Sequence, residues 1–298
     1  MRPCGVDTDI WRESVHRLLS AGLAGPAWWA ATLVGCTLIA SASLLGPLLL
    51  RGSVARRMVW IPRLLAFAVG ILASDALGHL LPHSVETMGM APTFLVAAAG
   101  FGLFAVVGRF LRKGAKSQIA PMASVSLGSD AIHNISDGAL IAAAFAVSPL
   151  LGVTTVIAIL AHEIPQELGD FAVLLEAGLA PARAAAANLA SALTVFAGAL
   201  AGLTLGASAP GLLAGLAPFA AGGFLYLALF VLLPALARHP LSGARWWLER
   251  LLPMALGVVV MAVLAVAEER LGLDHGHIHG IDDRPQPRSF APWHRQDG

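Results

Sequence analysis

Apolar residues fill long runs of this chain, and short stretches rich in Pro, Gly, Arg or Lys separate the runs. At about 20 residues, each run is long enough to cross the hydrocarbon core of a bilayer as an α-helix. Only helices and closed barrels satisfy their backbone hydrogen bonds in lipid, and runs this continuous favour helices. The pattern predicts eight transmembrane spans, at residues 27–50, 64–81, 93–110, 119–147, 151–174, 184–205, 212–236 and 251–268.

The composition supports a membrane protein and excludes an ordinary soluble domain. Hydrophobic residues make up 57% of the chain and charged residues only 12%, and the mean hydropathy is +0.75. We therefore expect an all-α, polytopic membrane protein whose single eight-helix domain covers residues 27–270. A polar leader, residues 1–26, precedes it, and a His-containing tail, residues 271–298, follows it. The leader lacks the apolar stretch of a cleaved signal peptide.

Cysteine usage and net charge add little to this picture. Cys4 lies in the leader and Cys36 in the first apolar run, so the sequence predicts no disulfide. The net charge is +1, and no segment resembles a nucleic-acid-binding module. We expect the lipid bilayer, and not nucleic acid, as a partner. The oligomeric state stays open, with a homodimer as one option.

The positions of the basic residues predict the orientation in the membrane. The connections at 84–92, 148–150 and 206–211 contain no Lys or Arg. The alternate connections contain Arg51, Arg56, Arg57, Arg63, Arg109, Arg112, Lys113, Lys116, Arg183, Arg238, Arg245 and Arg250. By the positive-inside rule, the basic connections are cytoplasmic and both termini face outward. Because the sequence shows no organelle signal, a bacterial inner membrane is the default location.

Two of the spans share a pattern. Residues 70–82 in span two and 222–234 in span seven have Gly, Ala, Leu, Leu-Leu and Pro at matching positions, although the two spans cross in opposite directions. This is the pattern of an inverted repeat, here of spans one to three and six to eight around spans four and five. Chance similarity between apolar helices is the alternative.

Spans four and five contain polar residues where a membrane helix normally has leucine. His133 and Asp137 are four residues apart, as are His162 and Gln166, so each pair lies on one face of its helix. Consecutive spans joined by a short turn pack antiparallel, so the two faces can meet at the same depth. Imidazole, carboxylate and amide ligands suit zinc, and also iron, manganese or cadmium. The predicted metal ligands are His133, Asn134, Asp137, His162, Glu163 and Gln166, enough for two adjacent ions.

Hydrogen bonding between helices is the simpler explanation for such residues. It explains a single His or Asn in a span. It does not explain two histidines, two amides and several carboxylates on facing helices, because each uncompensated charge in the membrane costs a few kcal/mol. Metal or proton handling is therefore favoured.

Two motifs resemble signatures of a known family, the ZIP transporters of zinc and iron. Residues 133–138, His-Asn-Ile-Ser-Asp-Gly, are similar to the fourth-helix signature. Residues 162–170, His-Glu-Ile-Pro-Gln-Glu-Leu-Gly-Asp, resemble the fifth-helix signature of the branch with His-Glu-x-Pro-His-Glu-x-Gly-Asp. Weaker similarities occur in spans two, six and seven, at residues 75–83, 188–191 and 221–226.

The resemblance implies eight helices with both ends outside and a binuclear metal site between helices four and five. It also implies movement of divalent metal into the cytoplasm, with an elevator-like displacement of one bundle against another as one option. Zn²⁺ would be the transported substrate, with Fe²⁺, Mn²⁺ and Cd²⁺ as alternatives, and no organic cofactor is implied. By the pattern of the family, His133, Asp137, His162 and Gln166 would bind one ion, and Asn134, Asp137, Glu163 and Gln166 the second.

The chain departs from the family pattern in three places. Gln166 replaces the more usual His or Glu, which changes the expected affinity and metal preference. Val231 and Ala235 stand where this branch often has acidic residues. The connection at 112–117 lacks the histidines that many relatives have there.

Further polar residues extend the predicted pathway. Asp75, His79, His83 and Glu86 recur at helical spacing in span two and suggest an entry track for cations, although His83 and Glu86 also fit ordinary helix-end chemistry. Glu167 and Asp170 are expected on the route toward the cytoplasm, and Asn188 and Ser191 belong to the similarity in span six. The histidines at 275–279 fit a solvated tail better than a metal collector.

Two functions of other classes remain as alternatives. Intramembrane zinc proteases carry His-Glu-x-x-His on one helix, with the Glu as general base. Here the last position is Gln166, and Pro165 stands between the two ligand positions, so we expect no enzyme. Spacing alone also permits a metal-gated or proton-coupled carrier of another substrate.

Overall fold

The computed structural model describes residues 26–50, 54–114, 119–205, 210–238 and 244–270, and every regular element within these ranges is a helix. The elements are α2 (Pro26–Ala42), α3 (Leu45–Leu49), α4 (Val54–Asp75), η1 (Ala76–Leu80), α5 (Leu81–Met88), α6 (Met90–Gly114), α7 (Ile119–Val147), α8 (Pro149–Glu176), α9 (Pro181–Ala192), α10 (Thr194–Leu205), α11 (Pro210–Ala214), α12 (Leu216–Tyr226), η2 (Leu227–Leu232), α13 (Leu233–Ala237), α14 (Ala244–Trp246), η3 (Trp247–Leu251) and α15 (Leu252–Arg270). The three η elements are π-helical segments that continue into α-helices.

Seven of the eight predicted membrane spans are found in the structure. Within the described ranges, seven helical stretches are long and apolar enough to cross a membrane, and they match predicted spans one to three and five to eight. The fourth is α7, a helix of 29 residues with the predicted bounds. At 1.5 Å per residue its length of about 44 Å exceeds the bilayer core. Its polar residues make it less apolar than the others. The all-α membrane fold is confirmed, and the eighth crossing stays a prediction.

Span two was predicted too short at both ends, and its helical stretch runs on through η1 and α5 to Met88. Helix α4 begins at Val54, before the predicted start of span two, because the helix continues through Pro62. Arg63 therefore lies on a helix and not in a connection, and its Nη2 is 3.6 Å from Oε1 of Glu249. The predicted leader and tail lie outside the described residues, so the domain limits stay predictions.

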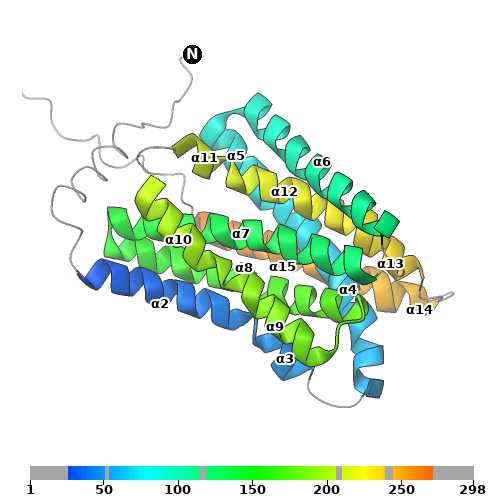
Figure 1. Ribbon diagram of the computed structural model, residues 1–298. Helices are drawn as coiled ribbons and strands as arrows, with labels where there is room; N and C mark the ends of the chain where they lie inside the picture. The colour runs from blue at the N-terminus through cyan, green and yellow to red at the C-terminus, as the bar shows by residue number, and fades with distance from the viewer. Residues whose placement is uncertain (1–25, 51–53, 115–118, 206–209, 239–243, 271–298) are drawn as a thin grey trace, which may run out of the picture.

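Helix α7 runs through the middle of the bundle, with α6 and α12 on one side and α2, α8 and α10 on the other (Figure 1). Two apolar clusters pack along it. One joins the C-terminal half of α7 to α2, the N-terminal half of α8, and α9 with α10. The other joins its N-terminal part to α4, α6, α12 and the C-terminal end of α8. The polar residues of α7 and α8 lie between the two clusters.

Glycines bring three pairs of helices into backbone contact. On α7 and α10, a Cβ atom added at Gly138 would lie 1.9 Å from the carbonyl oxygen of Val195, and one at Gly198 would lie 2.0 Å from that of Ile135. Similar contacts join α6 to α12 and α4 to α15. In lipid, where burial of apolar surface drives helix association only weakly, such close approach is a main source of attraction.

The two similar segments of spans two and seven adopt similar structures. Each contains a π-helical segment, η1 or η2, that is followed by Leu-Pro. The matching glycines have matching roles, because Gly70 contacts the backbone of α15 at Met254 and Gly222 contacts that of α6 at Ala97. These contacts favour the inverted repeat, which stays a prediction.

The glycine contacts predict the effect of Gly198→Ala. Alanine normally stabilises a helix by about 1 kcal/mol relative to glycine. Here the added methyl group would collide with α7, so we expect a loss of about 1–3 kcal/mol. Thermal unfolding of the purified protein in detergent measures the change. The control is Gly102→Ala on α6, where an added Cβ would meet no described atom within 4 Å. Equal melting temperatures for the two variants would contradict this packing.

Candidate metal centre

Four ligand side chains meet where α7 and α8 cross the middle of the bundle. His133 and Asp137 come from α7, and His162 and Glu163 from α8. One ligand atom from each lies within 4.8 Å of the others, and all four residues are buried. Only Ser148 separates the two helices, and its Oγ accepts a hydrogen bond from the backbone N–H of Leu151 at the start of α8. This tight turn makes the helices antiparallel neighbours, so the predicted faces do meet.

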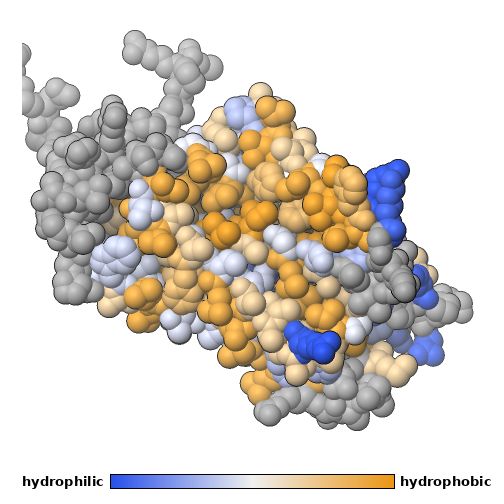
Figure 2. All heavy atoms as spheres, viewed as in Figure 1, coloured by the Kyte–Doolittle hydropathy of each residue, from blue (hydrophilic) through white to orange (hydrophobic). Residues whose placement is uncertain are grey.

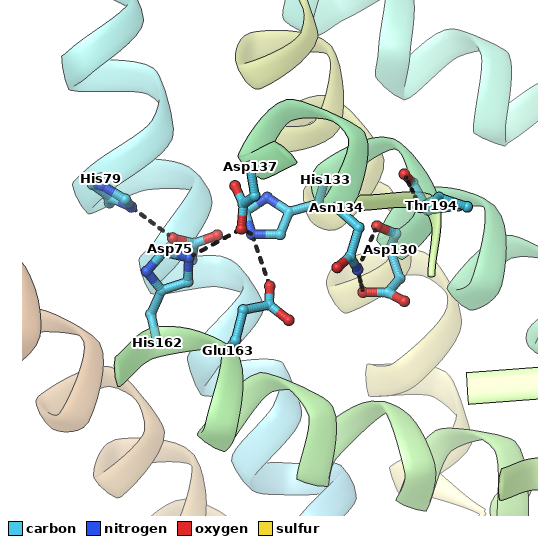
Figure 3. A network of polar contacts seen from close by, with 10 residues as sticks. Asp75, His79, Asp130, His133, Asn134, Asp137, His162, Glu163 and Thr194 are labelled. Atoms are coloured by element: carbon cyan, nitrogen blue, oxygen red, sulfur yellow. Dashed lines mark hydrogen bonds and ion pairs between the residues drawn. The ribbon is translucent and has the colours of Figure 1, made fainter. Parts of the chain in front are cut away.

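Asp137 lies between the two imidazole rings (Figure 3). Its Oδ2 is 3.6 Å from Nε2 of His133 and also 3.6 Å from Nε2 of His162. Oε1 of Glu163 is 3.3 Å from Nε2 of His133. The two rings are 5.7 Å apart, and the ring of Phe224 on α12 covers His133 at 5.0 Å. The ligand atoms of α7 and α8 therefore converge on one point between the two helices.

The charges of this cluster match those of a divalent cation. Histidine binds metal in its neutral form, so with metal bound the cluster carries the two negative charges of Asp137 and Glu163. One divalent ion balances both charges. Two imidazole nitrogens and two carboxylate oxygens also form a four-ligand set that zinc accepts. The arrangement can hold such an ion inside the membrane without leaving a net charge there.

The two predicted amide ligands are arranged differently from each other. Gln166 lies one turn after His162 and is 2% exposed, and neither atom of its amide makes a hydrogen bond to a described residue. Asn134 donates from Nδ2 to Oδ1 of Asp130 at 3.0 Å and to the carbonyl oxygen of Asp130 at 3.2 Å, while its Oδ1 is buried without a hydrogen-bond partner among the described residues (Figure 3). Gln166 is available as a fifth ligand. A second ion bound through Asn134 stays a prediction.

The prediction from sequence missed Asp130 as part of the site. This buried carboxylate orients Asn134, and its Oδ2 has no hydrogen-bond partner in the part of the chain that the structure describes. The signal was present, because Asp130 precedes Asn134 by four residues and shares its helical face. Phe224 was also missed, since contact between α12 and α7 depends on long-range packing.

The predicted entry residues lie on the continuous stretch formed by α4, η1 and α5, and His79 on this stretch lies beside His162. Glu86 is exposed, His83 is partly buried, and both lie on α5. On η1, His79 is partly buried, and its Nδ1 is 3.1 Å from Oδ1 of the fully buried Asp75. The ring of His79 is 5.6 Å from that of His162. Exposure falls step by step toward the cluster, as an entry track requires.

On the other side of the cluster, polar residues continue along α8. Glu167 accepts a hydrogen bond from Nδ2 of Asn188 on α9, and Oδ1 of Asp170 accepts one from Oγ of Ser126 on α7 at 3.1 Å. Ser191 donates to the carbonyl oxygen of Leu127 on α7 at 3.0 Å. The hydrogen bonds of Glu167 and Asp170 are buried, and that of Ser191 is partly buried. The acidic residues thus continue from the cluster toward the C-terminal end of α8.

Comparison with known proteins gives matches to zinc transporters. The family model described as ZIP Zinc transporter matches residues 111–265. Zinc transporter ZIP13 of Pongo abelii is 34% identical over 226 residues, which cover 69% of this chain and 67% of that protein. Zinc transporter ZIP10 of Mus musculus is 36% identical over 52% of this chain, and zinc transporter ZIP4 of Homo sapiens is 43% identical over 49%. The chain spans only 20% of the length of that ZIP10 and 22% of that ZIP4.

The geometry of the cluster predicts the effect of Glu163→Gln. The exchange removes one of the two negative charges that a divalent ion would balance, so zinc affinity should fall by at least about tenfold. Equilibrium dialysis of the purified protein with zinc measures it. Glu249→Gln, the same chemical change on η3 and outside both the cluster and the entry track, should leave the affinity unchanged. Equal affinities for the two variants would exclude Glu163 as a ligand.

Proposed function

Because this chain belongs to the ZIP zinc transporter family, we propose that it moves a divalent metal ion, with Zn²⁺ as its main substrate, across a membrane into the cytoplasm. The observation that carries this proposal is the buried cluster of His133, Asp137, His162 and Glu163 at the middle of two long helices. A site at that depth, with polar residues leading away on both sides, suits an ion in transit. It has no evident use in a protein that only anchors itself in lipid.

The ligands favour zinc without excluding related ions. Imidazole and carboxylate ligands bind zinc well and also accept iron, manganese and cadmium. Gln166 would contribute a neutral amide oxygen, which is a weaker ligand for zinc than imidazole. We therefore propose weaker and less selective binding than a third histidine would give. No organic cofactor is needed for such transport.

We further propose that the basic connections face the cytoplasm. The end of α6, the start of α4, α13 and α14 lie at one end of the bundle in Figure 1. These elements carry or adjoin the basic residues from which the orientation was predicted, including Arg112, Arg238 and Arg245. On this orientation the track from Glu86 to His79 begins at the outer surface, and Glu167 and Asp170 lie on the inward side. Location in a bacterial inner membrane stays part of the proposal.

An intramembrane protease is the alternative from another class. It needs a third ligand at the position of Gln166 and uses the glutamate of the motif as a base rather than as a ligand. Here Oε1 of Glu163 is 3.3 Å from Nε2 of His133, as expected for two groups that share a cation. The two functions predict opposite results for Glu163→Gln, because a protease would keep its metal and lose peptide cleavage.

Zinc uptake into proteoliposomes tests the proposed function. The intact protein should show saturable uptake of radioactive zinc, and His133→Ala and His162→Ala should each reduce it to the level of empty liposomes, because each removes a ligand. Thr37→Ala, at an exposed position on α2, is the control and should transport normally. Melting temperatures of all variants verify that they fold. Absence of uptake by the intact protein, with zinc still bound, would contradict transport.

The entry track predicts a separate effect for His79→Ala. His79 would receive the ion before the cluster does, so its loss should raise the zinc concentration for half-maximal uptake several-fold and leave the maximal rate nearly unchanged. Leu77→Ala is a matched control on the same π-helical segment, because Leu77 is 60% exposed. An unchanged half-saturation in His79→Ala would contradict the track.

A further inference from the structure

A cavity lies at the basic end of the bundle, away from the metal centre. Its volume is about 360 Å³, within the usual range of small-molecule sites. Its walls come from the C-terminal part of α6, the N-terminal part of α7, η2 and α13. The lining residues are Gly108, Arg112, Pro121, Met122, Val125, Phe230, Val231, Pro234 and Arg238.

Among the described residues that line the cavity, the only charged ones are two arginines. Arg112 comes from the end of α6 and Arg238 directly follows α13, so they approach the cavity from two different helices. Both are exposed, and neither makes an ion pair with a carboxylate among the described residues. Two such cations on one cavity attract an anion, and the planar guanidinium group suits phosphate in particular.

The rest of the lining is apolar. Val125 and Met122 are buried at its base, and the ring of Phe230 is 56% exposed at its edge. Phe230 stacks on Tyr226 with ring centroids 5.9 Å apart. The Tyr226 hydroxyl lies behind the wall, since a Cβ atom added at Gly108 would be 2.6 Å from it. This hydroxyl is buried without a hydrogen-bond partner among the described residues, so a donor remains available beside the cavity.

We propose that this cavity binds an anionic phospholipid, with its phosphate on Arg112 and Arg238 and an acyl chain along Phe230. The position of the cavity favours a lipid over a soluble phosphate compound. Apolar residues cover most of the face in Figure 2, and hydrophilic residues gather at the end where α6 and α13 finish. A headgroup and its chains meet the protein at such a boundary. Basic pockets between transmembrane helices are a known form of lipid site.

The bound lipid would contact three segments of the chain at once, namely α6, α7 and the stretch from η2 to Arg238. Helix α6 pairs with α12 through glycine contacts, whereas α7 pairs with α10 and carries two of the metal ligands. A lipid held by Arg112 and Arg238 would rest against the N-terminal part of α7, close to where α7 packs on α6 and α12. The site would therefore connect the lipid composition of the membrane to the packing of a helix that holds metal.

Lipid binding to the purified full-length protein tests the proposal. After lipid removal in a neutral detergent, the protein is titrated with phosphatidylglycerol or with phosphatidylcholine of the same acyl chains, and bound lipid is counted by native mass spectrometry. The double variant Arg112→Gln with Arg238→Gln removes the proposed contacts. The control Arg109→Gln with Arg183→Gln removes two exposed arginines outside the cavity, so the net charge changes equally.

The intact protein and the control should bind phosphatidylglycerol at least about tenfold more tightly than phosphatidylcholine, and the cavity variant should lose this preference, since each arginine contributes about 1 kcal/mol at such a surface. Equal preference in the cavity variant and the control would overturn the proposal. Glycerol 1-phosphate is added as a competitor, because it distinguishes a site for a lipid headgroup from a site for a soluble phosphate compound. Displacement of the lipid at an equal concentration would identify a soluble phosphate compound as the ligand and overturn the assignment to lipid.

Discussion

A charge in the middle of a bilayer requires a partner, and this requirement governs the packing around α7 and α8. Asp137 and Glu163 lie in the central part of two long helices, where solvent cannot stabilise them. Each lies within 3.6 Å of an imidazole nitrogen, which fixes the distance and rotation between the helices. The glycine contacts between α7 and α10 hold the other side of α7 in place. The two apolar clusters enclose the polar residues of α7 and α8 on either side along α7.

The sequence predicted those features that depend only on local periodicity. Run length gave the helices, and α7 has the predicted bounds. The spacing of four residues between His133 and Asp137 placed them on one face whatever surrounds the helix. Because a single residue connects α7 and α8, the two helices must pack side by side. The contact of His162 with Asp137 could therefore also be predicted. The family resemblance, which the comparisons confirm, rested on these same residues.

Features that depend on distant parts of the chain could not be predicted. Whether Asn134 bonds to Asp130 depends on the neighbours of both residues, and in the structure its Nδ2 donates to the Asp130 carboxylate. The contact of Phe224 with His133 requires knowledge of how α12 crosses α7. The start of α4 was placed too late because the arginines up to Arg63 were assigned to a connection, whereas the helix includes them and continues through Pro62 at the loss of one hydrogen bond. The cavity beside Arg112 and Arg238 joins three chain segments that no local pattern connects.

The carboxylates in the middle of α7 have a consequence for how the protein is made. A charged residue at the centre of a helix costs about 2.5–3.5 kcal/mol when that helix leaves the translocon for lipid, and α7 has both Asp130 and Asp137 in its central part. On its own, α7 would therefore insert poorly into the membrane. Because Ser148 is all that separates it from α8, the two helices can enter the membrane as one hairpin, in which His162 of α8 reaches the carboxylate of Asp137 on α7. The residues proposed to bind metal in the mature protein would then already act during synthesis, as the contacts that let a helix with buried carboxylates enter the membrane.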